Sequence, residues 1–243
     1  MKPAIIIQAR SGSKRLPQKV LAAFAGKTVL EYVVRRCQQA KHASCCIVAT
    51  SNLPADDAVS ELAASLGVLV FRGSENDVLL RYVEACRQYG VEVLVRITAD
   101  CPLVDPKIID QVIEQYERAP ADYVFVQDYP NGLGAAELMT LPALERTLAE
   151  TTPAQTHYRE HVMTYIIEHP KEFSLSLLDA PDALRKPTIH LSVDCPEDLE
   201  ITRQIAEHFA PRMDFDIPEV LGFLEQHPEL AALSQRRSAA ANR

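Results

Sequence analysis

The chain has 243 residues, of which 47% are hydrophobic and 24% are charged, and its formal net charge is -8. The hydrophobic fraction excludes an intrinsically disordered chain, and the length suits one large α/β domain. The acidic balance argues against a protein that binds nucleic acid or a membrane surface, because such proteins carry a basic excess. The first apolar run, residues 4–7, is too short for a signal core or a membrane span, so we expect a cytoplasmic protein.

The cysteines give no indication of a metal centre. The chain has six of them, with no CxxC pair and no His/Cys spacing typical of zinc sites. In a long chain without a secretory signal, we expect reduced thiols rather than disulfides.

Apolar, β-branched runs alternate with amphipathic segments along the first half of the chain. Strands are predicted at residues 3–8, 45–50, 68–71, 91–98 and 122–126. Helices are predicted at residues 28–40, 55–66 and 106–118, and another is expected to begin at Ser74 as its N-cap, with Asp77 three residues on. This alternation predicts an α/β fold with a mostly parallel sheet and helices on both faces. Ligands bind beyond the carboxyl ends of the strands in such sheets, so we expect a site among the loops after Gln8, Thr50, Phe71 and Thr98.

The pattern weakens in the second half. An irregular loop and a short helix are predicted for residues 127–153, helices for 158–168, 196–209 and 218–226, and strands for 173–178 and 188–193. The last residues are small and polar, and we expect them to fray. The prediction is therefore a single domain over residues 1–233, with an irregular segment at about 127–190 and a flexible tail at 234–243.

A basic loop, QARSGSKRLPQKVL, follows the first predicted strand at residues 8–21. Its four cations fall within ten residues of an acidic protein and are Arg10, Lys14, Arg15 and Lys19. The small residues 11–13 would let main-chain N–H groups approach a ligand closely. Cations and N–H groups at the carboxyl end of a strand indicate a polyphosphate site, the alternative being a solvated basic loop. The loop matches neither the Walker A pattern nor the dinucleotide-binding glycine pattern.

Two aspartates end two predicted strands in the same local pattern. Asp100 ends the strand in RITADCP, and Asp194 ends the later strand in HLSVDCP. The proline two residues on stops strand pairing in each case, so both carboxylates would project from the carboxyl edge of the sheet. Two carboxylates together with substrate phosphates make an ordinary Mg²⁺ site, and the cation would remove their mutual repulsion. The alternative for each residue, and above all for Asp194, is a helix N-cap.

Three segments, ARSGSKRLPQK, RITADCPLVDP and VDCPEDL, together resemble the cytidylyltransferases that activate 2-keto-3-deoxy sugar acids. The resemblance is greatest to the branch of spore-coat polysaccharide biosynthesis protein F. It implies a Rossmann-like fold of the nucleotide-diphospho-sugar transferase type, and Mg²⁺ held by Asp100 and Asp194. The chain departs from the family pattern at three places. Gln18 stands where relatives usually have Gly before the Lys, and the first aspartate motif reads TAD where TGD is common. The segment NGLGAAE, residues 131–137, only partly resembles the usual Gly-Leu-Asp-Val-Glu of the branch.

The same resemblance assigns the candidate site residues. The catalytic candidates are Arg10, Lys19 and Asp100. The nucleotide-binding candidates are Gln8, Ala9, Arg10, Ser11, Gly12, Arg15, Lys19, Arg72 and Asp77, the last two from the motif RGSENDVLLRY. The acceptor-binding candidates are Arg81, Arg96, Glu137 and His161. Arg96 could instead form a structural salt bridge, because it is a charge within an apolar strand, and His161 could equally be structural.

The implied reaction is in-line attack of an acceptor oxygen on the α-phosphorus of CTP with release of pyrophosphate, in surface polysaccharide biosynthesis. Asp100 and Asp194 would place Mg²⁺ on the α-phosphate, while Arg10 and Lys19 would stabilise the leaving group. The expected partners are a nucleotide triphosphate, a small-molecule acceptor bound on the segment at about 127–190, and a second copy in a homodimer, but no nucleic acid or membrane. Two alternatives stay open: a glycosyltransferase with a nucleotide-sugar donor, and a non-catalytic nucleotide-binding partner.

Overall fold

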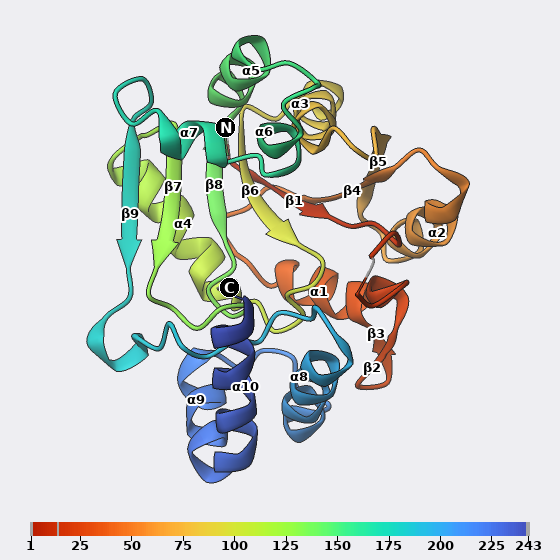
Figure 1. Ribbon diagram of the computed structural model, residues 1–243, viewed down its shortest axis with the longest axis vertical. Coiled ribbons are helices and arrows are strands. Elements are labelled where there is room, and N and C mark those ends of the chain that lie inside the picture. Colours follow the sequence, from red (N-terminus) through yellow and green to blue (C-terminus); the bar gives the residue numbers. More distant parts are fainter. Residues whose placement is uncertain (1, 14, 242–243) are drawn as a thin grey trace.

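The computed structural model describes residues 2–13 and 15–241, so Lys14 of the basic loop lies outside the described residues. Within them, a seven-stranded sheet forms the centre of the protein (Figure 1). In spatial order the strands are β5 (Leu69–Gly73), β4 (Cys46–Ser51), β1 (Ala4–Gln8), β6 (Val93–Thr98), β8 (Glu137–Thr140), β7 (Tyr123–Gln127) and β9 (Leu175–Asp179). Strand β8 is antiparallel to both neighbours and the other pairs are parallel, which confirms the prediction of a mostly parallel sheet.

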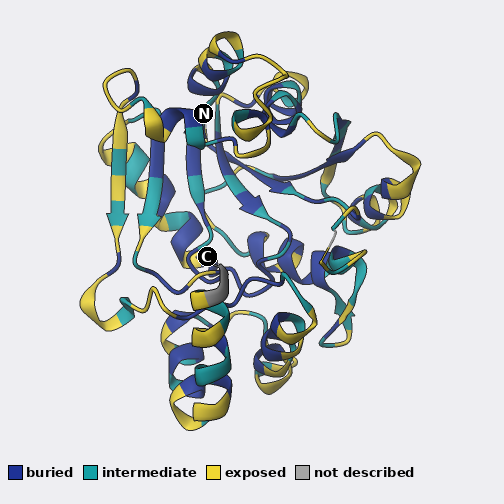
Figure 2. Ribbon diagram, in the orientation of Figure 1, coloured by how far each residue is buried: buried dark blue, intermediate teal, exposed yellow. Residues whose placement is uncertain are grey.

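Helices cover both faces of the sheet, as predicted, and bury its central strands (Figure 2). Ile5 and Ile7 of β1 belong to one apolar cluster and Ile6 to the other, because successive side chains of a strand point to opposite faces. The first cluster includes residues of α1 (Val29–Cys37), α2 (Asp57–Ser65) and α4 (Pro106–Arg118), and the second includes residues of α3 (Val78–Tyr89) and α5 (Leu141–Glu150). Short elements complete this part of the chain: η1 (Lys19–Leu21), β2 (Ala23–Phe24), β3 (Lys27–Thr28) and η2 (Pro54–Asp56).

The N-terminus of α3 differs from the prediction. Asp77, and not Ser74, is the N-cap, because its Oδ1 accepts a hydrogen bond from the Leu80 N–H at 2.9 Å. The Ser74 hydroxyl oxygen accepts from the Asp77 N–H at 3.0 Å and so fixes the turn that precedes the helix. Residues 75–76 therefore form a short loop that is fixed by the hydrogen bond between Ser74 and Asp77.

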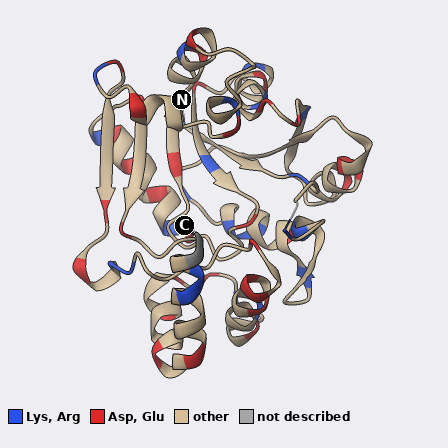
Figure 3. Ribbon diagram, viewed as in Figure 1, with Lys and Arg blue, Asp and Glu red and all other residues tan. Residues whose placement is uncertain are grey.

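The segment predicted to be irregular contains more regular structure than expected. Within residues 127–153, helix α5 is the short helix that was predicted, and strand β8 precedes it where a loop was expected. The helix predicted at 158–168 is two short helices, α6 (Thr156–Glu160) and α7 (Thr164–Glu168). Strand β8 escapes prediction because it is short and begins with the charged Glu137, which pairs with Arg96 on the neighbouring strand (Figure 3). The predicted strand at 188–193 is absent from the described structure apart from one bridge, Asn131 to His190, because the segment crosses the end of the sheet.

The described part of the chain ends in three helices, α8 (Pro196–Phe209), α9 (Ile217–Gln226) and α10 (Pro228–Ala241), after the short η3 (Asp182–Leu184). The predicted flexible tail at 234–243 is therefore helical as far as the structure describes it, and Ser234 within it is fully buried. The six cysteines, all in the described part of the chain, are unpaired. None of the described helices is long and apolar enough to cross a membrane.

Candidate active site

An open cavity of about 700 Å³ lies at the carboxyl ends of β1 and β6, the edge of the sheet where a ligand site was predicted. The basic loop forms one wall, the loop after β5 and helix α6 form another, and the turn before α8 contributes a carboxylate. The lining residues are Gln8, Arg10, Gly12, Ser13, Arg15, Lys19, Val20, Glu75, Asn76, Arg96, Thr98, Ala99, Asp100, Thr156, Glu160, His161 and Asp194. Sequence reasoning did not single out Glu75, Asn76, Thr156 or Glu160, although Glu75 and Asn76 lie within the motif RGSENDVLLRY.

The basic loop presents its cations to the cavity through its main-chain conformation. Gln18 adopts φ 55, in the left-handed region that favours glycine, and the turn η1 starts at the next residue, Lys19. This explains physically why glycine suits this position. A side chain at Gly12 would also be crowded, because its Cβ would lie 3.0 Å from Glu75 Oε1.

Two of the predicted nucleotide-binding residues hold the loop rather than line the cavity. Both Ala9 and Ser11 are buried. The Ser11 N–H donates to Asp56 Oδ1 at 2.6 Å, and its hydroxyl donates to the Ala55 carbonyl at 3.0 Å. The buried Asp56 carboxylate thus anchors the loop and is not itself part of the cavity lining.

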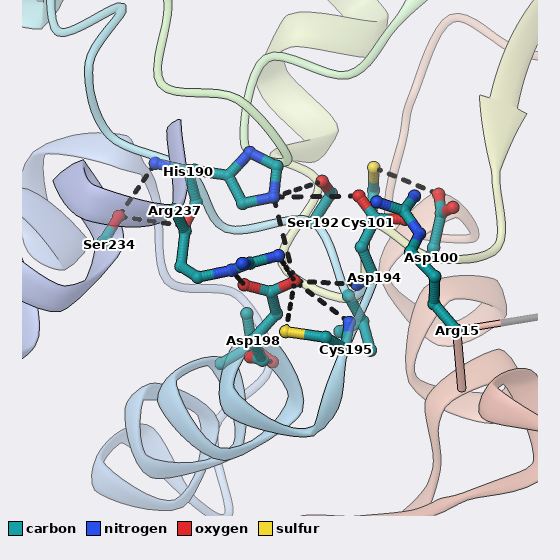
Figure 4. Close-up of polar contacts among 12 residues, drawn as sticks. Arg15, Asp100, Cys101, His190, Ser192, Asp194, Cys195, Asp198, Ser234 and Arg237 are labelled. Atoms are coloured by element: carbon teal, nitrogen blue, oxygen red, sulfur yellow. Dashed lines mark hydrogen bonds and ion pairs between the residues drawn. The ribbon is translucent and has the colours of Figure 1, made fainter. Parts of the chain in front are cut away.

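Lys19 brings the two predicted metal ligands together. Its Nζ donates to Asp100 Oδ2 at 2.8 Å and to the Val193 carbonyl at 2.8 Å, and lies 3.4 Å from Asp194 Oδ1. Arg15 adds a second cation, 2.8 Å from Asp194 Oδ1 (Figure 4). Burial acts to raise the pKa of Asp100, but the Lys19 ammonium holds that pKa below its ordinary value. Burial acts to lower the pKa of Lys19, yet the two carboxylates hold it above its ordinary value.

The oxygen atoms around Lys19 Nζ also suit a divalent cation. Two carboxylates and a main-chain carbonyl converge on one point, and hard oxygen donors of this kind are the ligands that Mg²⁺ prefers. Neither aspartate is an N-cap, since α4 is capped by Asp105 and α8 begins after Cys195. The alternative interpretation of these two carboxylates as helix caps is therefore wrong.

Arg96 forms the floor of the cavity and is also part of a salt bridge. Its Nη1 lies 2.5 Å from Glu137 Oε2, and the Tyr123 hydroxyl donates to Glu137 Oε1 at 2.5 Å. The second amino group of Arg96 donates to Gln8 Oε1 at 3.4 Å, so the Gln8 amide is held by the same network. Burial would lower the pKa of Arg96, but Glu137 holds it above its ordinary value. Arg96 therefore forms a structural salt bridge and also lines the cavity, where it could contact a ligand. Glu137, a predicted acceptor-binding residue, is the salt-bridge partner of Arg96 and is not among the lining residues.

Three other predicted residues support the walls without lining the cavity. Arg72 lies 2.7 Å from Asp57 and donates to the Ser51 carbonyl at 3.0 Å. Asp77 caps α3 and its Oδ2 lies 2.9 Å from the buried Arg159 of α6. Arg81 is fully buried and donates to the Ser74 carbonyl at 2.6 Å.

Helix α6 contributes Thr156 and Glu160 to the cavity lining. Glu160 Oε1 lies 3.0 Å from Arg10 Nη2 across the opening. His161, which follows at the end of the helix, also lines the cavity. Each cation of the described basic loop therefore faces a carboxylate: Arg10 faces Glu160, and Arg15 and Lys19 face the two aspartates.

Comparisons with known proteins agree with the predicted resemblance. A family model described as cytidylyltransferase matches residues 4–227. The chain is 38% identical to an uncharacterized protein of Methanocaldococcus jannaschii, over 95% of this chain and 93% of that protein. It is 32% identical to the spore coat polysaccharide biosynthesis protein SpsF of Bacillus subtilis, over 93% of this chain and 95% of that protein.

Solved structures share the fold. A cytidylyltransferase from Leptospira borgpetersenii superposes with a TM-score of 0.88 at 29% identity, over 95% of this chain and 97% of that one. The fold is thus the nucleotide-diphospho-sugar transferase type of Rossmann-like fold, as predicted. The family match spans nearly the whole chain, and it includes the basic loop and both aspartates of the cavity. This chain belongs to the cytidylyltransferase family.

Proposed function

We propose that this protein transfers the cytidylyl group of CTP to a sugar acid or a related small acceptor, with release of pyrophosphate, in surface polysaccharide biosynthesis. The observation that carries the proposal is the convergence of Arg15, Lys19, Asp100 and Asp194 at the carboxyl edge of the sheet. Membership of the cytidylyltransferase family supports the choice of CTP, and the similarity to a spore coat polysaccharide biosynthesis protein of Bacillus subtilis supports a role in polysaccharide biosynthesis. The site would work in the cytoplasm, where CTP is made, in a monomer or in the homodimer expected from the sequence.

The basic loop would bind the triphosphate. Arg10, Arg15 and Lys19 face the cavity, and Gly12 lets the main chain approach the phosphates closely. Lys19 and Arg10 would stabilise the charge that develops on the leaving pyrophosphate, which is the main contribution a protein makes to phosphoryl-type transfer. The carboxylates of Asp100 and Asp194 would hold Mg²⁺, whose charge would stabilise the α-phosphate oxygens in the transition state.

The acceptor would lie between the α-phosphate and helix α6. Arg96 is a partly buried cation on the cavity floor, suited to an anionic group of the acceptor, and Gln8 beside it is held in place by hydrogen bonding. His161 and Glu160 line the same end of the cavity and offer groups that can hydrogen-bond to hydroxyls. This arrangement supports a polyhydroxylated acid as the acceptor.

The first test is binding of nucleotides, followed by pyrophosphate release with a panel of sugar acids. CTP with Mg²⁺ should raise the melting temperature more than CTP alone, and more than UTP, GTP or ATP with Mg²⁺. Stabilisation by a nucleotide diphosphate sugar but by no triphosphate would instead support a glycosyltransferase. Binding of CTP without turnover on any acceptor would support a non-catalytic binding partner.

The two aspartates provide the sharper test. Asp100→Asn and Asp194→Asn should fold normally and lose at least about 100-fold in the rate of pyrophosphate release, since each removes a charge that stabilises the transition state. Asp214→Asn is a suitable control, because that side chain is 71% exposed and lies outside the cavity lining. Retention of the full rate by both cavity variants would refute the metal assignment.

A further inference from the structure

The segment that carries Asp194 lacks the support of a strand. Residues 189–194 cross the end of the sheet, with one bridge between Asn131 and His190. Near Asp194, the Val193 N–H donates to the Asp100 carbonyl at 2.7 Å. A catalytic carboxylate needs to be held to a fraction of an ångström, so further contacts must fix this segment.

A buried carboxylate, Asp198, organises the turn that presents Asp194 (Figure 4). Its Oδ2 accepts from the N–H groups of Asp194 and Cys195 at 3.0 and 3.1 Å, and from Cys195 Sγ at 3.3 Å. Its Oδ1 accepts from Arg237 Nε at 2.8 Å. An unpaired carboxylate at this depth would be costly, so the Arg237 guanidinium is the partner that allows Asp198 to stay ionised there.

Helix α10 holds the other end of the same segment. The Ser234 hydroxyl is fully buried, accepts from the His190 N–H at 2.8 Å and donates to the His190 carbonyl at 2.9 Å. Ser234 and Arg237 are three residues apart and therefore share one face of α10. That face touches the Asp194 segment at its beginning and, through Asp198, at its end.

A metal bound directly by His190, Asp194 and Asp198 explains this cluster less well. Ligand atoms of the three side chains lie within 4.8 Å of one another, which is a spacing that a metal could bridge. Both oxygens of Asp198, however, already accept hydrogen bonds from main-chain N–H groups, a thiol and a guanidinium. His190 Nε2 lies 3.2 Å from the Ser192 hydroxyl, within the same network. The cluster is therefore a support for Asp194.

We propose that α10 is a positioning element of the active site, in which Arg237 acts through Asp198, and Ser234 through the main chain of His190, to fix the carboxylate of Asp194. Both residues lie beyond residues 4–227, the part of the chain that the family model matches. The inference rests on the proposed function, in which Asp194 holds Mg²⁺. It predicts that substitutions on α10 change the affinity for metal at a distance, without touching any ligand.

The test compares Arg237→Met with Arg236→Met, its exposed neighbour on the same helix. Mn²⁺ is the probe, and its binding in the presence of CTP is measured by electron paramagnetic resonance, beside the melting temperature and the Mg²⁺ dependence of pyrophosphate release. We expect Arg237→Met to weaken Mn²⁺ binding and to raise the half-saturating Mg²⁺ at least tenfold, with KM for CTP changed less than threefold at saturating Mg²⁺. Arg236→Met should match the wild type in each measurement.

Conservative variants separate positioning from stability. Arg237→Lys keeps a cation beside Asp198 and should recover Mn²⁺ binding to within about threefold of the wild type, whereas Ser234→Ala should weaken it by several-fold. These two variants carry the test if Arg237→Met does not fold. Folded variants with wild-type Mn²⁺ affinity would overturn the role of α10 and leave the proposed function intact. A wild-type protein that binds no Mn²⁺ with CTP would refute the proposed metal site itself, and this inference with it.

Discussion

Replacing Lys19 with methionine tests whether the ammonium between the two aspartates can be exchanged for a divalent cation. The substitution keeps most of the length of the side chain but removes the ammonium between two carboxylates that are 27% and 19% exposed, and it leaves Asp194 with Arg15 as its remaining cation. Removing one partner of a buried ion pair costs about 3–5 kcal/mol. Partial exposure of the two carboxylates screens their repulsion, so we expect Lys19→Met to lower the free energy of unfolding by about 2–3 kcal/mol at pH 7.

The pKa shifts of Asp100 and Lys19 fix how this loss of stability should depend on pH. The pKa of Asp100 is lower in the folded protein than its ordinary value of 3.8, so its pairing stabilises the fold above that pH and is lost as the pH falls further. The pKa of Lys19 is raised above 10.5, so its contribution persists below that pH and is lost as the pH rises through the folded-state pKa. The difference in stability between wild type and variant should therefore be full at pH 7 and shrink below about pH 4, where carboxylates protonate.

Urea denaturation with and without Mg²⁺ measures whether a divalent cation can replace the Lys19 ammonium. In the variant, 10 mM Mg²⁺ should recover much of the lost stability, whereas it should stabilise the wild type less, because Lys19 competes for the same oxygens. Lys27→Met is the matched control, because Lys27 forms a surface pair with Glu31 at 3.6 Å and its loss should cost at most about 0.5 kcal/mol. An equal effect of Mg²⁺ on wild type and Lys19→Met would refute the reasoning.

Two glycine-related predictions concern the loops that carry the site. Gln18→Gly should raise the free energy of unfolding by about 0.5–1 kcal/mol, because Gln18 lies at φ 55 and a left-handed residue with a side chain is strained; an unchanged or lower urea midpoint would contradict this. Gly132→Ala should destabilise the protein by about 2–4 kcal/mol and slow pyrophosphate release, since a Cβ would lie 2.5 Å from the Leu191 carbonyl group, in the segment that leads to Asp194. Gly222→Ala, where a Cβ meets nothing within 4 Å, controls for the change of residue type, and an equal effect of both substitutions would refute the argument.

The fold could be predicted where local pattern and long-range environment agree. Helix α4 has the predicted bounds, because its apolar positions recur at helical spacing and Asp105 followed by Pro106 marks its start. Strand β8 could not be predicted, since the charge of Glu137 is compensated by Arg96, a residue 41 positions away. The segment 188–193 alternates like a strand but crosses the end of the sheet, which no local pattern reveals.

The site was predictable in its centre and less so in its surroundings. The carboxyl edge of a parallel sheet necessarily gathers the loops after β1 and β6, so the meeting of Lys19 with Asp100 follows from topology. Arg81 resembles a pocket residue in a family motif, yet it is buried beneath the loop that lines the cavity. The motif RGSENDVLLRY therefore contains residues that support the cavity wall as well as residues that line the cavity. Helix α10 was missed because the side chains that tie it to the site are polar, and their partners lie 39 and 44 residues away.

The charges of the cavity explain why nucleotide and metal are expected to bind together. Among the residues that the structure describes, its lining contains four Lys or Arg and four Asp or Glu side chains, within a chain of net charge -8. A free triphosphate would bring several negative charges into a cavity whose cations already face carboxylates, and a free divalent cation would have to displace Lys19 from Asp100. If both bound as proposed, the carboxylates of Asp100 and Asp194 would hold the cation, and Lys19 and Arg15 would be free to pair with the phosphates. Each ligand would then reduce the electrostatic cost of binding the other. By linkage this coupling must be reciprocal, and it is the physical reason that stabilisation by CTP should depend on Mg²⁺.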